Sequence, residues 1–349
     1  MKSQSLVEYA EPLVETEAEE MVPQGTEVLV RVSHCGVCHS DVHLQDGYFE
    51  LGDDRRLDVR SGRELPFTLG HEIAGEVASA GPEVTGLRAG ESYVIYPWIG
   101  CGNCGFCANG EEHLCQSPRA LGIDVDGGYA THVLVPHPRY LLSAEGIDPE
   151  IAGSYMCSGL TAYSALKKVV AHGRSGALMI IGAGGVGLMC LQFAKAMFET
   201  DVLVADINPA KREAALELGA SAVFDPGDRE ARRAIMKATG GGVVAAIDFA
   251  GTESSLDFAQ RVAGKGGLVV VVGLMGGKFS LPGPMFAFRA LTVTGGFAGS
   301  IEEAREMLDL VRSGAVTPIP VELRPLGEAN RSLDDLRASN VVGRIVLTP

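Results

Sequence analysis

The chain has 349 residues, enough for about two domains of ordinary size. Its hydrophobic fraction of 46% and charged fraction of 21% are typical of a folded globular protein, and they exclude disordered, collagen-like and coiled-coil classes. With 29 basic and 44 acidic residues the net charge is −15, so we expect neither nucleic acid nor an anionic membrane among the partners.

The N-terminal segment is polar and acidic and has no apolar stretch of the secretory type. Residues 175–194 are uncharged and long enough for a membrane span, but they include five glycines, and we interpret them as a strand and a turn instead. Eight cysteines in a chain without a secretory signal are more often metal ligands than disulfides, and we expect a cytoplasmic location.

The first 150 residues predict a mostly β domain. Apolar and polar residues alternate over three short segments, which glycine-containing turns separate. The predicted strands are 26–32, 71–79 and 91–97.

The pattern changes near residue 158, where strand-like and helix-like segments begin to alternate. This order predicts a doubly wound parallel sheet. The predicted strands are 177–181, 201–205, 222–224, 243–248, 267–272 and 291–294, and the predicted helices between them are 186–199, 209–218 and 229–239. A helix over 301–312 and a strand over 344–347 follow, and they indicate a return to the first domain.

A glycine loop follows the first strand of the alternating region. Residues 182–187 read Gly-Ala-Gly-Gly-Val-Gly, where Gly182 would allow a tight turn, Gly184 the approach of a pyrophosphate and Gly187 close helix packing. Asp206, nineteen residues after Gly187, would accept hydrogen bonds from the adenosine ribose and repel a 2′-phosphate, which favours NAD over NADP. Lys211 could pack beside the same ribose.

Four cysteines in one short segment predict a structural zinc site. Cys101, Cys104, Cys107 and Cys115 can complete a tetrahedral thiolate shell with no open position. An iron–sulfur cluster is the main alternative, but the last gap is seven residues and no proline follows it.

The chain resembles the zinc-dependent alcohol dehydrogenases of the medium-chain dehydrogenase/reductase superfamily. The resemblance rests on G-V-C-H-S-D from Gly36, G-H-E from Gly70, the four-cysteine loop, C-S-G-L-T-A-Y from Cys157 and the glycine loop, all in family order. It implies a β-rich GroES-like catalytic domain over residues 1–158 and 298–349, with the structural zinc loop at 100–116, and a Rossmann cofactor domain over residues 159–297.

The resemblance also implies a second zinc ion and the remaining site residues. The catalytic zinc would be held by Cys38, His71 and Cys157, a ligand set typical of alcohol dehydrogenases. Asp41 would orient His71, Glu72 would lie behind the metal, Ser40 would contact the substrate oxygen, and His43 would end a proton relay. Cofactor contacts are implied for His39, Thr161, Gly185, Val186, Gly273, Leu274 and Arg344, beside the glycines, Asp206 and Lys211 named above.

The implied activity is oxidation of a primary, secondary or cyclic apolar alcohol, or the reverse reduction, with NAD and two zinc ions per chain. Trp98 would line the substrate pocket or pack against the zinc loop, and Met156, Leu274, Met275, Met285 and Phe286 are further pocket candidates. The alternatives are a polyol or amino-alcohol dehydrogenase of the same superfamily and a non-catalytic zinc-binding relative. We expect a homotetramer or homodimer. The charged residues 49–62 exceed the family pattern, and we interpret them as a surface loop.

Overall fold

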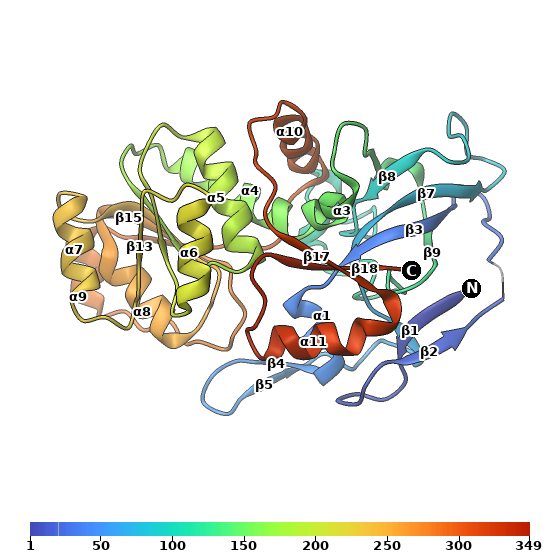
Figure 1. Cartoon of the computed structure of the whole chain (residues 1–349), viewed down its shortest axis with the longest axis horizontal. Coiled ribbons are helices and arrows are strands. Elements are labelled where there is room, and N and C mark those ends of the chain that lie inside the picture. The colour runs from blue at the N-terminus through green and yellow to red at the C-terminus, as the bar shows by residue number, and fades with distance from the viewer. Residues whose placement is uncertain (20) are drawn as a thin grey trace.

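A six-stranded parallel sheet forms one half of the computed structural model, which describes residues 1–19 and 21–349 (Figure 1). The strand order is β13-β12-β11-β14-β15-β16, which confirms the predicted doubly wound sheet. The strands are β11 (Leu178–Ile181), β12 (Val202–Ala205), β13 (Ala222–Phe224), β14 (Val243–Asp248), β15 (Ala263–Val271) and β16 (Thr292–Gly295). Registers such as Ile180↔Val204 and Ile180↔Ile247 place β11 at the centre, where the strand order reverses.

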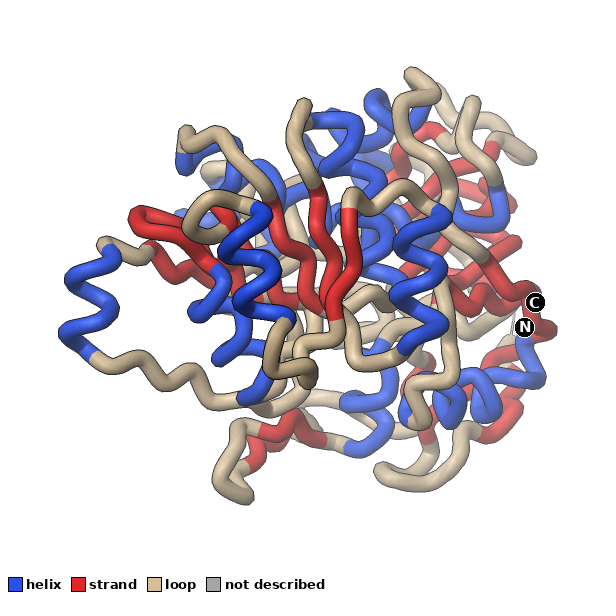
Figure 2. The backbone as a smooth tube through the Cα atoms, turned by 60° about the vertical axis from the view of Figure 1, so that its left-hand side comes forward, coloured by secondary structure: helices blue, strands red, loops and turns tan. Residues whose placement is uncertain are grey.

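Helices cover both faces of this sheet (Figure 2). They are α4 (Ser158–His172), α5 (Gly185–Met197), α6 (Pro209–Glu217), α7 (Ala231–Ala238), α8 (Glu253–Val262) and α9 (Gly283–Arg289). Side chains of the central strands therefore point alternately into two apolar layers: Ile180 belongs to one buried cluster, and Met179 and Ile181 belong to the other. The strands were predictable as apolar segments because both of their faces are buried.

The other half is built on a seven-stranded sheet that joins the two ends of the chain. Its strands are β3 (Val28–Gly36), β7 (Glu72–Ala80), β8 (Ser92–Ile95), β9 (His132–Val135), β10 (Leu141–Ser143), β17 (Val321–Pro325) and β18 (Arg344–Thr348). β18 pairs with β3 through Leu347↔Cys35, so the C-terminal segment returns to the N-terminal sheet (Figure 1). The predicted residue limits of the two domains remain a prediction.

Shorter elements surround this sheet. A second, three-stranded sheet contains β1 (Lys2–Leu6), β2 (Val14–Glu17) and β6 (Phe67–Thr68). The helices are α1 (His39–Asp46), α2 (Gly105–Ala108), α3 (Pro149–Ala152), α10 (Ile301–Arg312) and α11 (Ala329–Arg337), and the 3-10 turns are η1 (Glu112–Leu114), η2 (Pro138–Tyr140), η3 (Gly153–Met156) and η4 (Leu326–Glu328). One continuous apolar cluster runs from this half into one face of the parallel sheet, so the two halves share a core.

Residues 49–62 are not a plain surface loop. They contribute most of a hairpin of β4 (Tyr48–Glu50) and β5 (Arg56–Asp58), which stays largely exposed. The hairpin tip contacts the segment after β15: Asp53 forms an ion pair with Lys278, and a side-chain carbon built on Gly276 would lie 2.7 Å from Cβ of Glu50. The hairpin therefore joins the two halves of the molecule.

Among residues 1–19 and 21–349, none of the helices is both long enough and apolar enough to cross a membrane.

Candidate active site and metal centres

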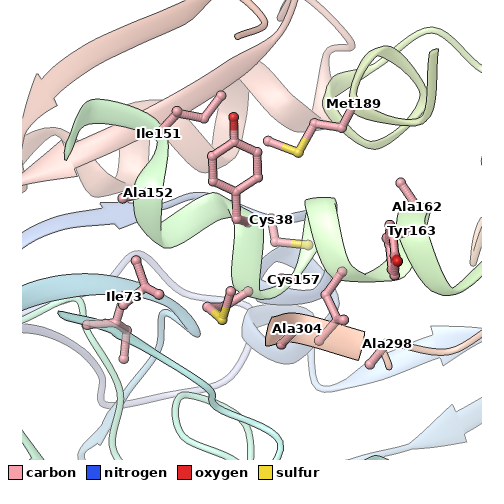
Figure 3. Packing of buried hydrophobic residues seen from close by; sticks show 14 of the residues in the cluster. Cys38, Ile73, Ile151, Ala152, Cys157, Ala162, Tyr163, Met189, Ala298 and Ala304 are labelled. Atoms are coloured by element: carbon pink, nitrogen blue, oxygen red, sulfur yellow. The ribbon is translucent and has the colours of Figure 1, made fainter. Parts of the chain in front are cut away.

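Four buried side chains from three distant segments converge beside the start of α4. Cys38 precedes α1, His71 and Glu72 lie at the start of β7, and Cys157 precedes α4. Their candidate ligand atoms all lie within 4.8 Å of one another. Figure 3 shows Cys38 and Cys157 among the buried residues around this helix. The structure thus brings together the three residues predicted as ligands of the catalytic zinc.

Asp41 fixes the orientation of His71. One carboxylate oxygen lies 3.2 Å from Nδ1 of His71, and the other accepts hydrogen bonds from the Cys38 backbone N–H and the Tyr129 hydroxyl, both at 2.9 Å. Nε2 of His71 is buried and has no hydrogen-bond partner among the described residues. An unpartnered imidazole nitrogen facing two cysteine sulfurs fits a metal ligand, because the carboxylate holds the other ring nitrogen.

The two thiols of this cluster are electrostatically unequal. A hydrogen bond from Cys157 holds the pKa of the Cys38 thiol well below its ordinary value. The same hydrogen bond, together with burial, raises the pKa of Cys157. A thiolate at Cys38 beside a buried imidazole is the donor chemistry that zinc prefers.

Glu72 is turned toward an arginine. Its Oε1 accepts a hydrogen bond of 2.8 Å from Ser158 and forms a fully buried ion pair with Arg344. Arg344 also lies against the glycine loop, since a side-chain carbon built on Gly185 would come within 2.2 Å of Cδ of Arg344. Arg344, expected among the cofactor contacts, therefore connects the glycine loop with Glu72.

The predicted proton-relay residues lie on α1. Oγ of Ser40 is 3.8 Å from Sγ of Cys38. His43, one turn further along, is half-buried, and its ring packs against Phe49 of the hairpin at a centroid distance of 4.6 Å and an interplanar angle of 37°. Burial lowers the pKa of His43, so this imidazole is neutral and able to accept a proton near pH 7. His39, at the start of the same helix, also has a pKa lowered by burial.

Trp98 lies beside the metal ligands. Its indole Nε1 donates a 2.9 Å hydrogen bond to the Met156 carbonyl, and its ring centroid is 5.8 Å from that of His71. Phe297 packs edge-on against the indole at 5.3 Å and is 50% exposed. The pocket candidate Met285 is wrong, because it lies on α9 and faces the amino ends of β14 and β15, away from the glycine loop. Phe286 lies on the same helix, and its place in the substrate pocket stays a prediction.

The glycine loop has the geometry expected of a phosphate-binding turn. Gly182 adopts φ +90°, which only glycine adopts without strain. A side-chain carbon on Gly187 would lie 1.8 Å from the Gly182 carbonyl oxygen, so the helix could not approach the strand with any other residue there. The same atom on Gly184 would meet nothing within 4 Å, which leaves backbone open to a ligand at the amino end of α5, together with Gly185 and Val186.

Asp206 directly follows β12 and is hydrogen-bonded to the glycine loop. Its Oδ2 accepts a 2.7 Å hydrogen bond from the Ala183 N–H, and its Oδ1 accepts one of 2.8 Å from Asn208. Lys211 follows on α6. Thr161 lies half-buried in the first turn of α4, and Gly273 packs against Gly251 where β14 and β15 end, followed by the exposed Leu274. The predicted cofactor-contacting residues thus surround the carboxyl ends of the central strands.

The second cysteine cluster lies apart from the first. The measured sulfur–sulfur distances are 3.5 Å for Cys104–Cys107, 3.8 Å for Cys104–Cys115 and 4.0 Å for Cys101–Cys107. Four thiolates at Zn–S bonds of about 2.3 Å in a tetrahedron are about 3.8 Å apart, so the cluster fits zinc. Backbone N–H groups lower the pKa of Cys104 to about 6, which favours the thiolate.

The sequence interpretation did not identify several residues that contact the predicted site residues. Tyr129 and Ser158 bind the carboxylates of Asp41 and Glu72, and Phe49 and Phe297 contact predicted site residues. Glu112, between two zinc-site cysteines, accepts hydrogen bonds from the Gly100 N–H and the Tyr140 hydroxyl and anchors the lobe to the core. No spacing signal could have found these residues, because their partners are remote in sequence.

Fold and sites together define a zinc-binding, two-domain dehydrogenase, and the chain belongs to the zinc-binding medium-chain alcohol dehydrogenase family. Residues 24–145 match the family of alcohol dehydrogenase GroES-like domains, and residues 185–313 match the zinc-binding dehydrogenase family. An NAD-dependent alcohol dehydrogenase of Sulfurisphaera tokodaii is 37% identical over 351 residues, which cover 100% of both chains.

Solved structures agree with this assignment. The alcohol dehydrogenase of Aeropyrum pernix superimposes with a TM-score of 0.88 at 29% identity, covering 100% of both chains. The D-arabinose dehydrogenase of Sulfolobus solfataricus gives a TM-score of 0.85 at 27% identity, covering 100% of this chain and 99% of the other. The predicted GroES-like and Rossmann fold classes are confirmed.

Proposed function

We propose that this chain is an NAD-dependent alcohol dehydrogenase that interconverts an alcohol and its aldehyde or ketone. The observation that carries the proposal is the buried set of Cys38, His71 and Cys157. Asp41 contacts Nδ1 of His71, and Nε2 of this ring has no hydrogen-bond partner among the described residues. Three such ligands would hold zinc with one position open to substrate. The NAD-dependent relative of 37% identity supports the choice of cofactor.

Each bound group supplies chemistry that the side chains lack. A zinc ion held by Cys38, His71 and Cys157 would favour ionisation of an alcohol and polarise a carbonyl in the reverse direction. NAD bound at the glycine loop would accept or return the hydride. A zinc ion held by Cys101, Cys104, Cys107 and Cys115 would have four protein ligands, and its role would be to hold this lobe together.

The chain's own residues orient the reactants and move the proton. Ser40, beside Cys38, would take the hydroxyl proton of the substrate, and the neutral His43 would carry it toward solvent. Trp98 and the partly exposed Phe297 would form an apolar wall beside the metal ligands. Asp206 would bind the adenosine ribose while holding the loop through the Ala183 N–H.

Substrate class and assembly are further parts of the proposal. The aromatic wall favours simple, secondary or cyclic apolar alcohols. Similarity to a D-arabinose dehydrogenase favours a sugar or polyol as the second candidate. We propose a cytoplasmic homotetramer or homodimer, because symmetric assembly is the usual state of soluble oligomers and Phe288 on α9 is 77% exposed.

Initial rates with NAD and with NADP over primary, secondary, cyclic and polyhydric alcohols test the proposal. We expect turnover with NAD and apolar alcohols, and weaker use of NADP because Asp206 repels a 2′-phosphate. Preference for polyols would select the second candidate. Absence of turnover in protein shown to hold two zinc ions per chain would reject the enzymatic function. Light scattering of the same sample measures the assembly.

A further inference from the structure

A basic pocket lies on the cofactor half, away from both cysteine clusters. It has a volume of about 840 Å³ and is lined by Arg174, Arg232, Arg261, Lys265 and Arg289, with no acidic residue among its lining residues. The whole chain has a net charge of −15, so a concave surface with five cations and no carboxylate is a local reversal of its charge. Clefts lined by charges of one sign concentrate the field and attract counter-ions.

Four of these cations lack a carboxylate partner within residues 1–19 and 21–349. Arg261 forms an ion pair with Asp257 on its own helix. Arg174, Arg232, Lys265 and Arg289 form no ion pair with any described residue. Burial and the nearby positive charge of Arg232 lower the pKa of the Arg289 guanidinium. Two guanidinium groups that repel each other would be stabilised by an anion between them.

Helix capping explains part of this arrangement. Arg289 donates to the carbonyls of Gln260 and Ala263, and Arg232 donates to the carbonyl of Arg261, so both bind the carboxyl end of α8. These contacts use three donors of the ten that two guanidinium groups carry. Arg174 and Lys265 donate no side-chain hydrogen bond among the described residues, so capping does not explain their position in the pocket.

The pocket is distinct from the cofactor site. Val243 begins β14 in the pocket, whereas the other end of that strand, Asp248, binds the Gly251 N–H near the glycine loop. Five residue steps of strand separate the two ends by roughly 17 Å. One side of the pocket is formed by Gly240, Gly241 and Gly242, all with positive φ, so no side chains fill this side. Met236 on α7 and Met285 on α9 line the pocket. Figure 1 shows these two helices at the end of the cofactor half that is far from the other half.

We propose that this pocket binds a small multivalent anion that carries phosphate groups. Guanidinium groups match phosphate oxygens in paired hydrogen bonds, and the volume suits a small molecule. The unpaired Arg174 and Lys265 add charge at the rim, and the donors left free on Arg232 and Arg289 bind the oxygens. This site is independent of the alcohol chemistry proposed above.

Calorimetric titration of the zinc-loaded, full-length protein with fructose 1,6-bisphosphate tests the proposal. The probe carries two phosphate groups on separate carbons and so competes weakly for zinc. We expect one site per chain, retained when NAD is present and weakened as ionic strength rises. Absence of binding at about 0.05 M ionic strength would overturn the proposal. Loss of binding in the presence of NAD would place the anion at the glycine loop and also overturn it.

Two double variants identify the residues. Arg174→Ala/Lys265→Ala removes two lining cations, and we expect a loss of affinity of at least roughly tenfold. Arg233→Ala/Lys237→Ala removes the same charge from the exposed side of α7, outside the pocket, and we expect less than about a twofold change. Equal losses in both would indicate general attraction to the surface and overturn the proposal.

Two further measurements distinguish a phosphate-carrying ligand from other occupants of the pocket. Succinate, a dianion without phosphate, should bind at least roughly tenfold more weakly than the bisphosphate, and equal affinity would overturn the phosphate assignment. If the bisphosphate does not bind and Arg174→Ala/Lys265→Ala instead changes the molar mass in light scattering, the pocket belongs to a subunit interface, which also overturns the proposal. Alcohol turnover of both variants verifies that they fold.

Discussion

At the scale of single residues, this family member depends on a few buried polar side chains that hold one another in place. Asp41 binds His71, Cys38 and Tyr129, and Glu72 binds Ser158 and Arg344. Buried polar networks of this kind are strong when every member is satisfied and costly when one partner is removed. The metal ligands therefore respond also to changes in residues such as Tyr129 and Ser158, which lie outside the predicted ligand and cofactor-contacting residues.

The first residue-scale prediction compares two neighbouring cysteines. Cys38→Ser should remove one of two zinc ions and lower kcat at least roughly a thousandfold, because one of three ligands to the reactive metal is lost. Cys35→Ser is the control, since Cys35 is equally buried but lies outside the ligand cluster. Metal analysis and initial rates measure both. Retention of two zinc ions by Cys38→Ser would contradict the assignment.

The second concerns the buried ion pair between Arg344 and Glu72. Arg344→Ala should lower the free energy of unfolding by about 3–5 kcal/mol, since it leaves the buried carboxylate without its charged partner. Urea denaturation of the zinc-loaded protein measures the loss. The double variant Arg344→Met/Glu72→Gln should recover part of it, because neither charge is then buried alone. A single variant as stable as the parent chain would show that the pair contributes nothing.

At the scale of elements, the chain combines self-contained segments with bridging ones. The lobe from Gly100 to Gln116 carries all four ligands of its cluster and is tied to the core through Glu112. The hairpin of β4 and β5 instead bridges the two halves through Asp53 and Lys278. Its strands are short and exposed, so it depends on the contacts at its tip.

The lobe gives the element-scale prediction. Cys104→Ser should release the structural zinc and lower the thermal midpoint by several degrees, because the short α2 and η1 turns have little apolar core of their own. Limited proteolysis should cleave between residues 100 and 116. Metal analysis should still find the zinc held by Cys38, His71 and Cys157. Loss of both zinc ions together would show that the two sites are coupled.

At the scale of the whole molecule, the parallel sheet and the seven-stranded sheet share one apolar cluster. Arg344 contacts both Gly185 of the glycine loop and Glu72 of the ligand cluster, which places the loop after β11 near the metal ligands. A cofactor bound at the glycine loop would therefore face the metal ligands. The basic pocket lies at the amino ends of β14 and β15, and so it does not face the metal ligands or the glycine loop.

Stability against pH is a property of the whole fold. Burial lowers the pKa of His34 and His43 from 6.5, so the unfolded chain binds more protons than the folded one as pH falls below 6.5. Above pH 6.5 the two histidines do not lower the free energy of unfolding. As pH falls from 6.5 toward their folded-state pKa values, each histidine lowers it by no more than about 1.4 kcal/mol per pH unit.

Urea denaturation at about pH 7 and about pH 5.5 measures this loss. The free energy of unfolding of the double variant His34→Gln/His43→Gln should depend less on pH. Glutamine does not take up a proton, so the unfolded variant gains two fewer protons than the unfolded parent chain as pH falls. Equal slopes for the variant and the parent chain would contradict the prediction. His71 does not affect the comparison, because the variant and the parent chain both contain it.

The sequence by itself determined what depends on local patterns. Apolar segments buried on both faces revealed the strands of the parallel sheet, and β13 and β14 have the predicted bounds. The four-cysteine loop and the glycine loop each lie in one short segment, so spacing, together with the strand and helix predicted on either side of the glycine loop, was enough to predict their chemistry. The resemblance to a family supplied Cys38, His71 and Cys157 as one ligand set, which no spacing links.

Only the tertiary structure decided how distant segments meet. In the folded chain Glu72 forms an ion pair with Arg344, and Trp98 lies beside His71. Phe49 packs against His43, and Met285 lies away from the glycine loop. The tertiary structure also gathered Arg174, Arg232, Lys265 and Arg289 into one pocket. Periodicity reports which face of an element is buried, but not which remote side chain meets it, because that depends on the packing of all the elements together.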